Sequence, residues 1–228
     1  MLTNKDELKR MAAGAALDEV RSGMRLGLGT GSTAEHFLRG LAERIDEGSI
    51  AAIRCVATSN TIASLAASLE VPCLDFHQLP ELDLSVDGAD EIDPSLRLIK
   101  GHGGALLKEK IIAQASKRYI VIADDSKKVT RLGKCLLPVE VATFAAQPLR
   151  ERFRAMGIDP SPRMAGREWF VTDEGHRIFD VTVPPDRDIA DLVDQLRLIA
   201  GVVETGFFPN EADEAFIAGP GGIERLRR

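Results

Sequence analysis

Hydrophobic positions in the first half of the chain follow two alternating periods. Spacings of three and four residues, as in Leu8, Met11 and Ala15, are typical of the buried face of a helix. They predict helices over residues 5–22, 34–45, 59–69 and 105–115. Short apolar runs between these segments predict strands over residues 24–29, 50–57, 71–76, 82–86 and 119–123. Strands that alternate with helices indicate an open, largely parallel sheet with helices on both faces.

The periodicity changes near Leu132. Helices are expected over residues 149–156 and 189–199, and strands over residues 137–144, 168–172, 177–183 and 202–208. The turn sequence Asp173-Glu174-Gly175 predicts a hairpin between the second and third of these strands. The order β-α-β-β-α-β is that of a ferredoxin-like unit.

A last apolar run, residues 215–218, is expected to form a strand that returns to the first sheet. The second unit is then inserted near the C-terminal end of the first. We therefore expect two domains: a larger α/β domain formed by residues 1–131 and 209–228, and an inserted ferredoxin-like domain over residues 132–208.

Composition narrows the range of partners. The net charge of −6 disfavours a nucleic acid or an anionic membrane, and an acidic protein that binds an anion must gather positive charge locally. Three widely spaced cysteines, Cys55, Cys73 and Cys135, form no CxxC motif and argue against a disulfide framework or a zinc site. No apolar run approaches the length of a membrane span, and the charged start MLTNKDELKR lacks the apolar region of a signal peptide. We expect a cytoplasmic protein.

The segment Gly27-Leu-Gly-Thr-Gly-Ser-Thr33 lies where a predicted strand meets a predicted helix. Glycines let an anion approach the backbone, and a helix N-terminus offers free N–H groups. A dinucleotide site needs a glycine where Ser32 stands and an acid after the second strand, which ends Arg54-Cys-Val-Ala57. We therefore expect a site for one phosphate or a polyol. A tight turn that binds nothing is the alternative, which the hydroxyls of Thr30, Ser32 and Thr33 disfavour.

The acidic segment Asp87-Gly-Ala-Asp90-Glu91-Ile-Asp93 follows a strand, at the edge where open α/β sheets bind ligands. Crowded carboxylates repel one another unless a cation, a substrate or a proton compensates. A divalent-cation loop, acid–base chemistry with hydroxyl recognition, and a solvated turn all remain open. The spacing does not fit an EF-hand, and the solvated turn suits Asp93 better than Asp87.

A second glycine-rich turn, Lys100-Gly-His-Gly-Gly104, opens the helix that carries Glu109. Lys100 could place a positive charge beside a developing enediolate. Glu109 could equally be a solvated residue that pairs with Lys108 or Lys110, and His102 is expected to be a turn residue. Lys127 and Lys128 follow the strand over residues 119–123 and could close over a phosphate or form a charged surface loop.

Four segments resemble, in order and separation, motifs of the ribose-5-phosphate isomerase A family. They are GTGSTA (29–34), SVDGADEID (85–93), KGHGGALLKEK (100–110) and IADDSKK (122–128). DELKR near the start and GVVETGFF (201–208) also resemble that family. The resemblance covers nearly the whole chain, and the ordered set is highly specific.

The resemblance implies a Rossmann-like domain with a ferredoxin-like lid domain. It implies interconversion of D-ribose 5-phosphate and D-ribulose 5-phosphate by proton transfer through an enediol(ate), in the non-oxidative branch of the pentose phosphate pathway. The expected enzyme is cytoplasmic, needs no metal or cofactor, and is a homodimer or tetramer whose ligand is a small sugar phosphate. The isolated histidines His36, His77 and His176 agree with proton transfer rather than a metal-assisted hydride shift.

The resemblance also implies roles for single residues. Glu109 matches the catalytic base, Asp87 the acid that helps ring opening and proton movement among the oxygens, and Lys100 the cation beside those oxygens. The positions expected to bind the substrate and its phosphate are Lys9, Thr30, Gly31, Ser32, Thr33, Asp87, Gly88, Ala89, Asp90, Lys100, Gly101, His102, Gly103 and Lys127.

Two departures and two alternatives accompany this assignment. The family usually has Gly at the position of His102 and often His at the position of Thr205. A sugar-phosphate-binding regulator would normally add a helix-turn-helix segment, for which we expect no room before residue 24. A transferase that uses Glu109 as a nucleophile in acyl-CoA chemistry would form a covalent adduct, and the chain is short for that class.

Overall fold

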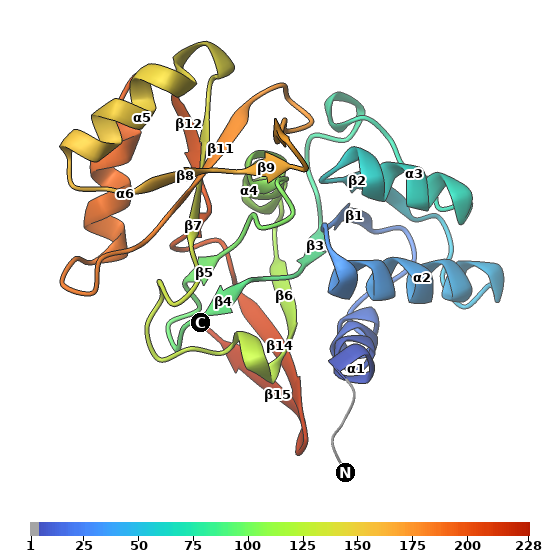
Figure 1. Cartoon of the computed structure of the whole chain (residues 1–228). Coiled ribbons are helices and arrows are strands. Elements are labelled where there is room, and N and C mark those ends of the chain that lie inside the picture. Colours follow the sequence, from blue (N-terminus) through green and yellow to red (C-terminus); the bar gives the residue numbers. More distant parts are fainter. Residues whose placement is uncertain (1–4) are drawn as a thin grey trace.

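A six-stranded sheet forms the centre of the larger part of the molecule (Figure 1). The computed structural model describes residues 5–228. Strands β2, β1, β3, β6 and β14 are parallel and adjacent in that order, and β15 is antiparallel at the edge. The predicted largely parallel sheet, and the return of the chain's end to it, are therefore confirmed. The bounds are Arg25–Leu28 for β1, Arg54–Ala57 for β2, Leu84–Asp87 for β3, Tyr119–Asp124 for β6, Glu214–Gly219 for β14 and Gly222–Arg227 for β15.

Both faces of this sheet are buried, which explains why its strands are continuous apolar runs. In β6, Ile120 and Ile122 pack into one core with helices α1, α2 and α3, while Val121 and Ala123 pack into the core on the opposite face. That second face is covered by α4 and a small antiparallel sheet in the order β13-β5-β4. The bounds are Lys5–Leu17 for α1, Ser32–Asp46 for α2, Asn60–Ser68 for α3, Leu106–Gln114 for α4, Glu91–Ile92 for β4, Leu98–Ile99 for β5 and Phe207–Phe208 for β13.

A second, antiparallel sheet has the strand order β12-β7-β11-β8. Helices α5 and α6 pack against it around Phe153, Phe179 and Leu192, so the chain order is the expected β-α-β-β-α-β. Figure 1 shows helix α4 between this sheet and the larger one. The bounds are Leu137–Val141 for β7, Pro160–Pro162 for β8, Arg177–Val181 for β11, Val202–Thr205 for β12, Ala146–Ala155 for α5 and Ile189–Arg197 for α6.

The second strand of this sheet is not the one that the sequence pattern predicts. We expected residues 168–172 to pair with the strand around Phe179, but β8 takes that place. The expected segment instead contributes β10 (Glu168–Trp169) to a small hairpin with β9 (Met164–Ala165). Proline cannot donate to a β-ladder, so the pattern disfavours Pro-Ser-Pro as a strand. An edge position tolerates it, because only one side of an edge strand is paired.

The strand expected over residues 71–76 is also missing. Cys73 makes one isolated bridge with Cys55, and the chain then turns into a short 3₁₀ helix, Phe76–Gln78. The carbonyl of Pro72 accepts from the N–H of Cys55, but Pro72 has no N–H of its own to donate, so the pairing does not extend toward residue 71. Two further 3₁₀ turns lie at Asp125–Lys127 and Thr143–Ala145.

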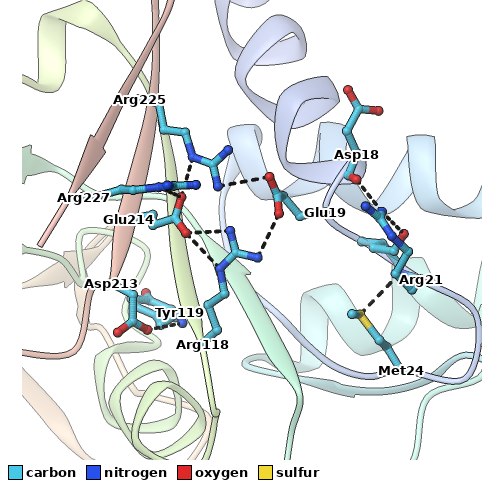
Figure 2. A network of polar contacts seen from close by, with 11 residues as sticks. Asp18, Glu19, Arg21, Met24, Arg118, Tyr119, Asp213, Glu214, Arg225 and Arg227 are labelled. Atoms are coloured by element: carbon cyan, nitrogen blue, oxygen red, sulfur yellow. Dashed lines mark hydrogen bonds and ion pairs between the residues drawn. The ribbon is translucent and has the colours of Figure 1, made fainter.

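An arginine–glutamate network fastens the C-terminal hairpin to the end of the sheet that lies away from the carboxyl ends of the strands (Figure 2). Glu214 at the start of β14 accepts hydrogen bonds from Arg118 (2.6 Å), Arg225 (2.5 Å) and Arg227 (3.2 Å). Glu19, just after α1, pairs with Arg118 and Arg225. Burial raises the pKa of Glu214, but the three guanidinium groups outweigh it and lower the pKa to about 2.

Replacing Glu214 with glutamine is expected to destabilise the fold by up to about 3.5 kcal/mol at pH 7, because the pKa falls from 4.5 to about 2 and each unit of pKa shift corresponds to about 1.4 kcal/mol. A carboxylate with a lowered pKa stabilises the fold above its unfolded-state value and loses that contribution as the pH falls. The difference between wild type and variant in urea unfolding should therefore shrink between about pH 4.5 and pH 2. Glu224→Gln, which breaks an exposed pair with Lys128, is the control and should change the unfolding free energy by less than about 1 kcal/mol. Equal effects of the two variants would contradict this expectation.

Candidate active site

Four loops meet at the carboxyl edge of the large sheet and enclose one pocket. They follow β1 and β3, precede α4, and follow β6. This is the edge at which open α/β sheets bind ligands. The residues that line the pocket are Lys9, Thr30, Gly31, Ser32, Thr33, Gly88, Ala89, Asp90, Lys100, Gly101, Gly103, Glu109 and Lys127.

The loop after β1 is shaped by close contact with β3. Gly29 passes so near that a Cβ atom would lie 2.5 Å from Cα of Asp87, so only glycine fits there. Thr30 donates its backbone N–H to Asp87 Oδ1 (3.0 Å). Gly31 has φ +108°, a conformation that favours glycine, and helix α2 begins at the next residue. The first N–H groups of α2 therefore border the pocket.

Positive charge is concentrated around this loop. Lys9 of α1 donates to Ser32 Oγ (2.8 Å), and Lys127 reaches the same pocket from the turn after β6. A helix N-terminus with two lysines and several hydroxyls is a suitable site for a phosphate group. The acidic chain thus carries the local cation excess that binding of an anion requires.

A buried group of two carboxyls and one amine lies deeper in the site. Lys100 Nζ is 3.0 Å from Asp87 Oδ2 and 3.5 Å from Glu109 Oε2, and it donates to the carbonyl of Gly88 (2.6 Å). The exposed fractions are 1% for Asp87, 2% for Lys100 and 4% for Glu109. Asp87 is held further by the N–H groups of Thr30 and Gly88. Of these three residues, Lys100 and Glu109 line the pocket, whereas Asp87, which was expected to bind the substrate, lies behind its wall.

Burial determines the protonation of these groups. It raises the pKa of Glu109 to about 8, with Lys100 opposing the shift and the carboxylates of Asp87 and Asp90 adding to it. Burial also raises the pKa of Asp87, against the influence of Lys100. Burial lowers the pKa of Lys100, but the two carboxylates outweigh it, so the pKa lies well above its ordinary value. Glu109 can therefore gain and lose a proton near neutral pH.

The lysines that flank Glu109 do not pair with it, which removes the alternative of a solvated helical glutamate. Lys108 contacts Glu174 (2.7 Å) in the turn between β10 and β11. Lys110 is 2% exposed and donates to Glu204 Oε1 and to two backbone carbonyls in residues 205–207. Neither lysine lines the pocket: Lys108 attaches α4 to the turn before β11, and Lys110 attaches it to β12 and β13, while Glu109 faces the pocket.

Some expected site residues are not brought into the pocket. His102 does not line it: its Nδ1 lies 3.3 Å from Asp90 Oδ1 and its Nε2 3.2 Å from the carbonyl oxygen of Leu136. Lys128, one of the two candidate phosphate lysines, pairs instead with Glu224. Thr205, the second departure from the family pattern, is buried outside the pocket lining, and its carbonyl accepts from Lys110.

The acidic segment after β3 divides into pocket and scaffold residues. Asp90 lines the pocket, whereas Glu91 accepts from the N–H groups of Gly133 and Cys135. Asp93 accepts from the N–H of Ser95 and from Arg97. Within residues 5–228, no group of three or more His, Cys, Asp or Glu side chains is arranged to hold a metal ion.

Three polar residues close to the site, Thr58, Ser59 and Tyr119, were not identified from the sequence. Thr58 and Ser59, which follow β2, lie 2.7 and 2.8 Å from the hydroxyl of Thr30. Their position after a predicted strand was the available signal. Tyr119 is fully buried in the region of Lys100, and burial raises the pKa of its phenol well above the usual value.

Comparisons with known proteins agree over nearly the whole chain. The family model of ribose 5-phosphate isomerase A (phosphoriboisomerase A) matches residues 54–222. The ribose-5-phosphate isomerase A of Sinorhizobium fredii is 50% identical over 226 residues, which cover 96% of this chain and 97% of that protein. That of Sphingopyxis alaskensis is 48% identical over 213 residues, which cover 92% of this chain and 91% of that protein.

Solved structures give the same result. A D-ribose-5-phosphate isomerase in complex with phospho-erythronic acid has a TM-score of 0.94 at 36% identity, covering 99% of this chain and 100% of that one. The ribose 5-phosphate isomerase of Plasmodium falciparum has a TM-score of 0.93 at 34% identity, covering 98% and 99%.

The fold, the pocket and these similarities define the protein as an enzyme of the isomerase class. More particularly, the chain belongs to the ribose 5-phosphate isomerase A family. The resemblance drawn from the motifs is thereby confirmed. In the described part of the chain, no helix is both long and apolar enough to cross a membrane.

Proposed function

We propose that this chain interconverts D-ribose 5-phosphate and D-ribulose 5-phosphate by proton transfer through a cis-enediolate, with Glu109 as the base. The observation that carries the proposal is a buried glutamate 3.5 Å from Lys100, on the wall of a pocket that also holds a phosphate-type loop. A base, a nearby cation and a remote anchor are the three requirements of this reaction.

In the proposed reaction, Glu109 removes the proton from C2 of the open-chain aldose. The electrons form the C1–C2 double bond of the enediolate, and Lys100 stabilises the negative charge on oxygen. Glu109 returns the proton to C1, while a proton passes from O2 to O1 and yields the ketose. Asp87, hydrogen-bonded within the same group, assists ring opening and proton movement among the oxygens.

The remainder of the pocket binds the sugar chain and the phosphate in this proposal. Residues 30–33, Lys9 and Lys127 hold the phosphate, and Asp90 with the loop around Gly101 and Gly103 meets the hydroxyls. The ligand of the similar solved enzyme, phospho-erythronic acid, supports this: it joins a phosphate to a planar carboxylate that resembles an enediolate. Phosphate binding can hold the reactive carbons in place.

The two-domain organisation is part of the same proposal. Residues 1–131 and 209–228 would form the catalytic domain, of which residues 1–4 lie outside the described part, and residues 132–208 would form the lid domain. We also propose a cytoplasmic homodimer or tetramer that acts in the non-oxidative branch of the pentose phosphate pathway and needs no metal or cofactor.

The deciding experiment is conversion of ribose 5-phosphate to ribulose 5-phosphate by the purified protein, with and without EDTA. We expect conversion that EDTA leaves unchanged. Loss of activity in EDTA would move the chemistry to a metal held by the acidic segment after β3. No conversion in either condition would favour a binding protein or a different sugar phosphate.

The pH dependence follows from the raised pKa of Glu109. A general base works only when it is deprotonated, so kcat/KM should rise with pH through about 8. For one group of that pKa, the increase from pH 7 to pH 9 is about tenfold. The rate should be measured at constant ionic strength, with substrate stability checked at each pH. A flat profile over this interval would contradict the assignment of the base.

A further inference from the structure

The loop of residues 100–104 is contacted from outside by an arginine that directly follows the edge strand of the second sheet. The guanidinium of Arg163, which lies between β8 and β9, donates through Nη1 to the carbonyl oxygens of Gly101 (2.6 Å) and His102 (3.2 Å). These are the two residues directly after Lys100. Gly101 itself lines the pocket, so the contact reaches the pocket wall from behind.

The same arginine is fixed within its own domain. Its Nε donates to Asp180 Oδ2 on β11 (2.9 Å), and its Nη2 donates to the other carboxylate oxygen. Its backbone N–H donates to the carbonyl of Ile178 (2.9 Å). A two-pronged pair of this kind fixes the plane of the guanidinium and leaves Nη1 aimed at the loop. The side chains of Arg163 and Asp180 are only 12% and 17% exposed.

An aromatic contact reinforces this attachment. Phe170 donates its N–H to the carbonyl of Arg163 (2.9 Å), and its ring lies below the guanidinium at 6.0 Å. A Cβ atom on Gly104 would lie 2.4 Å from that ring, so the ring packs directly on the glycine backbone. Arg163 therefore binds the first half of the glycine-rich turn, and Phe170 packs against its last residue.

The turn is also held by its own Gly104 N–H, which donates to the carbonyl of Gly101 (2.9 Å), and by the N–H of His102, which donates to Asp90 Oδ2 (3.1 Å). The contacts of Arg163 and Phe170 connect it to residues that follow β8. Gly101 and Gly104 have φ values of +102° and +83°, and glycine backbones are intrinsically mobile. The turn joins Lys100 to the helix that carries Glu109, so its shape sets the relative position of the proposed cation and base.

We propose that Arg163 is a positioning residue for the isomerisation. Its hydrogen bonds connect residues 101 and 102 to the proposed lid domain, residues 132–208, and so hold Lys100 and Glu109 in position relative to the bound sugar. The inference rests on the proposed function. Arg163 does not line the pocket and takes no part in proton transfer. Its loss should therefore affect kcat more than phosphate binding, since a displacement of about 1 Å in a site can lower a rate about a hundredfold.

The test compares Arg163→Ala, Arg163→Lys and Asp180→Asn with wild type. We expect kcat to fall roughly ten- to a hundredfold in Arg163→Ala. The dissociation constant of inorganic phosphate should stay within about threefold of wild type. Arg163→Lys should recover part of the rate because an ammonium group can still donate to a carbonyl, and Asp180→Asn should give a smaller loss. If Arg163→Ala does not fold, the other two variants carry the test.

A matched control is Arg131→Ala. Arg131 also donates to two backbone carbonyls, those of Pro185 and Arg187, and none of these three residues lines the pocket. It should keep the wild-type kcat. Near-normal kcat in all the Arg163 and Asp180 variants, or equal losses in Arg131→Ala, would overturn the inference. Failure of wild type itself to convert ribose 5-phosphate would instead refute the proposed function.

Discussion

Replacement of Glu109 by glutamine is expected to lower kcat by about 10³- to 10⁴-fold, the upper range for loss of a general base. Glutamine has nearly the same shape and can still accept a hydrogen bond, so the fold and the binding of inorganic phosphate should persist. Only the ability to take a proton from carbon is lost. The measurement is initial-rate kinetics with ribose 5-phosphate, together with phosphate binding by calorimetry and a thermal unfolding curve.

The matched control for this variant is Glu140→Gln. Glu140 is a fully buried carboxyl of β7 that accepts hydrogen bonds from Thr172 (2.9 Å) and contacts His176, and it lies outside the pocket. Burial raises its pKa, as it does for Glu109. The control should retain most of the activity even if it loses some stability. A Glu109→Gln enzyme with a near-full rate would show that another group is the base.

The larger sheet was predictable because each of its central strands is buried on both faces and is therefore a short run of apolar residues. Continuous apolar runs such as residues 119–123 are expected wherever both faces of a strand are buried, and β6 has that environment. The loop after β1 was predictable for a similar reason, since Gly29 and Gly31 each have a backbone requirement that only glycine meets easily. The requirement at Gly31 is a property of its own backbone conformation, whereas the requirement at Gly29 arises from the close approach of Asp87 on β3.

The second sheet was less predictable because one of its strands depends on position rather than composition. Pro160 and Pro162 would be excluded from a central strand, and only the place of β8 at the sheet edge permits them. That place is a property of the assembled sheet. The order of apolar and polar residues along the chain does not show which strand will lie at the edge of the sheet.

The candidate site shows the same division. The motif order pointed to Asp87, Lys100 and Glu109, but a glutamate on a helix is usually exposed to solvent, and the sequence alone does not show that Glu109 is buried. What sets Glu109 apart is that Lys108 and Lys110 are occupied by partners 65 to 97 residues away in the chain. Its environment is therefore a tertiary property, as is the attachment of the glycine-rich turn by Arg163.

Replacement of Lys100 by methionine is expected to disable the enzyme in two ways. It removes the cation beside the developing oxyanion, a loss worth about 10²- to 10³-fold in kcat for comparable groups. It also removes the positive charge that lowers the pKa of Glu109 and of Asp87. Both carboxyls should then hold their protons at higher pH, so the alkaline rise of kcat/KM should move above its wild-type position near pH 8.

The stability of this variant should depend on pH in a direction that follows from the same shift. A carboxyl whose pKa is raised on folding binds more protons in the folded state, so stability falls as the pH rises toward the folded-state pKa. Lys100→Met should therefore fold near pH 6 and lose stability faster than wild type between pH 6 and pH 9 in urea titrations. Lys117→Met, which removes a 66% exposed lysine paired with Asp83, is the control and should change neither profile. If Lys100→Met kept both the wild-type rate and the wild-type pH dependence, the buried group would be a structural ion pair, and stabilisation of the oxyanion would have to come from the N–H groups of the neighbouring loops.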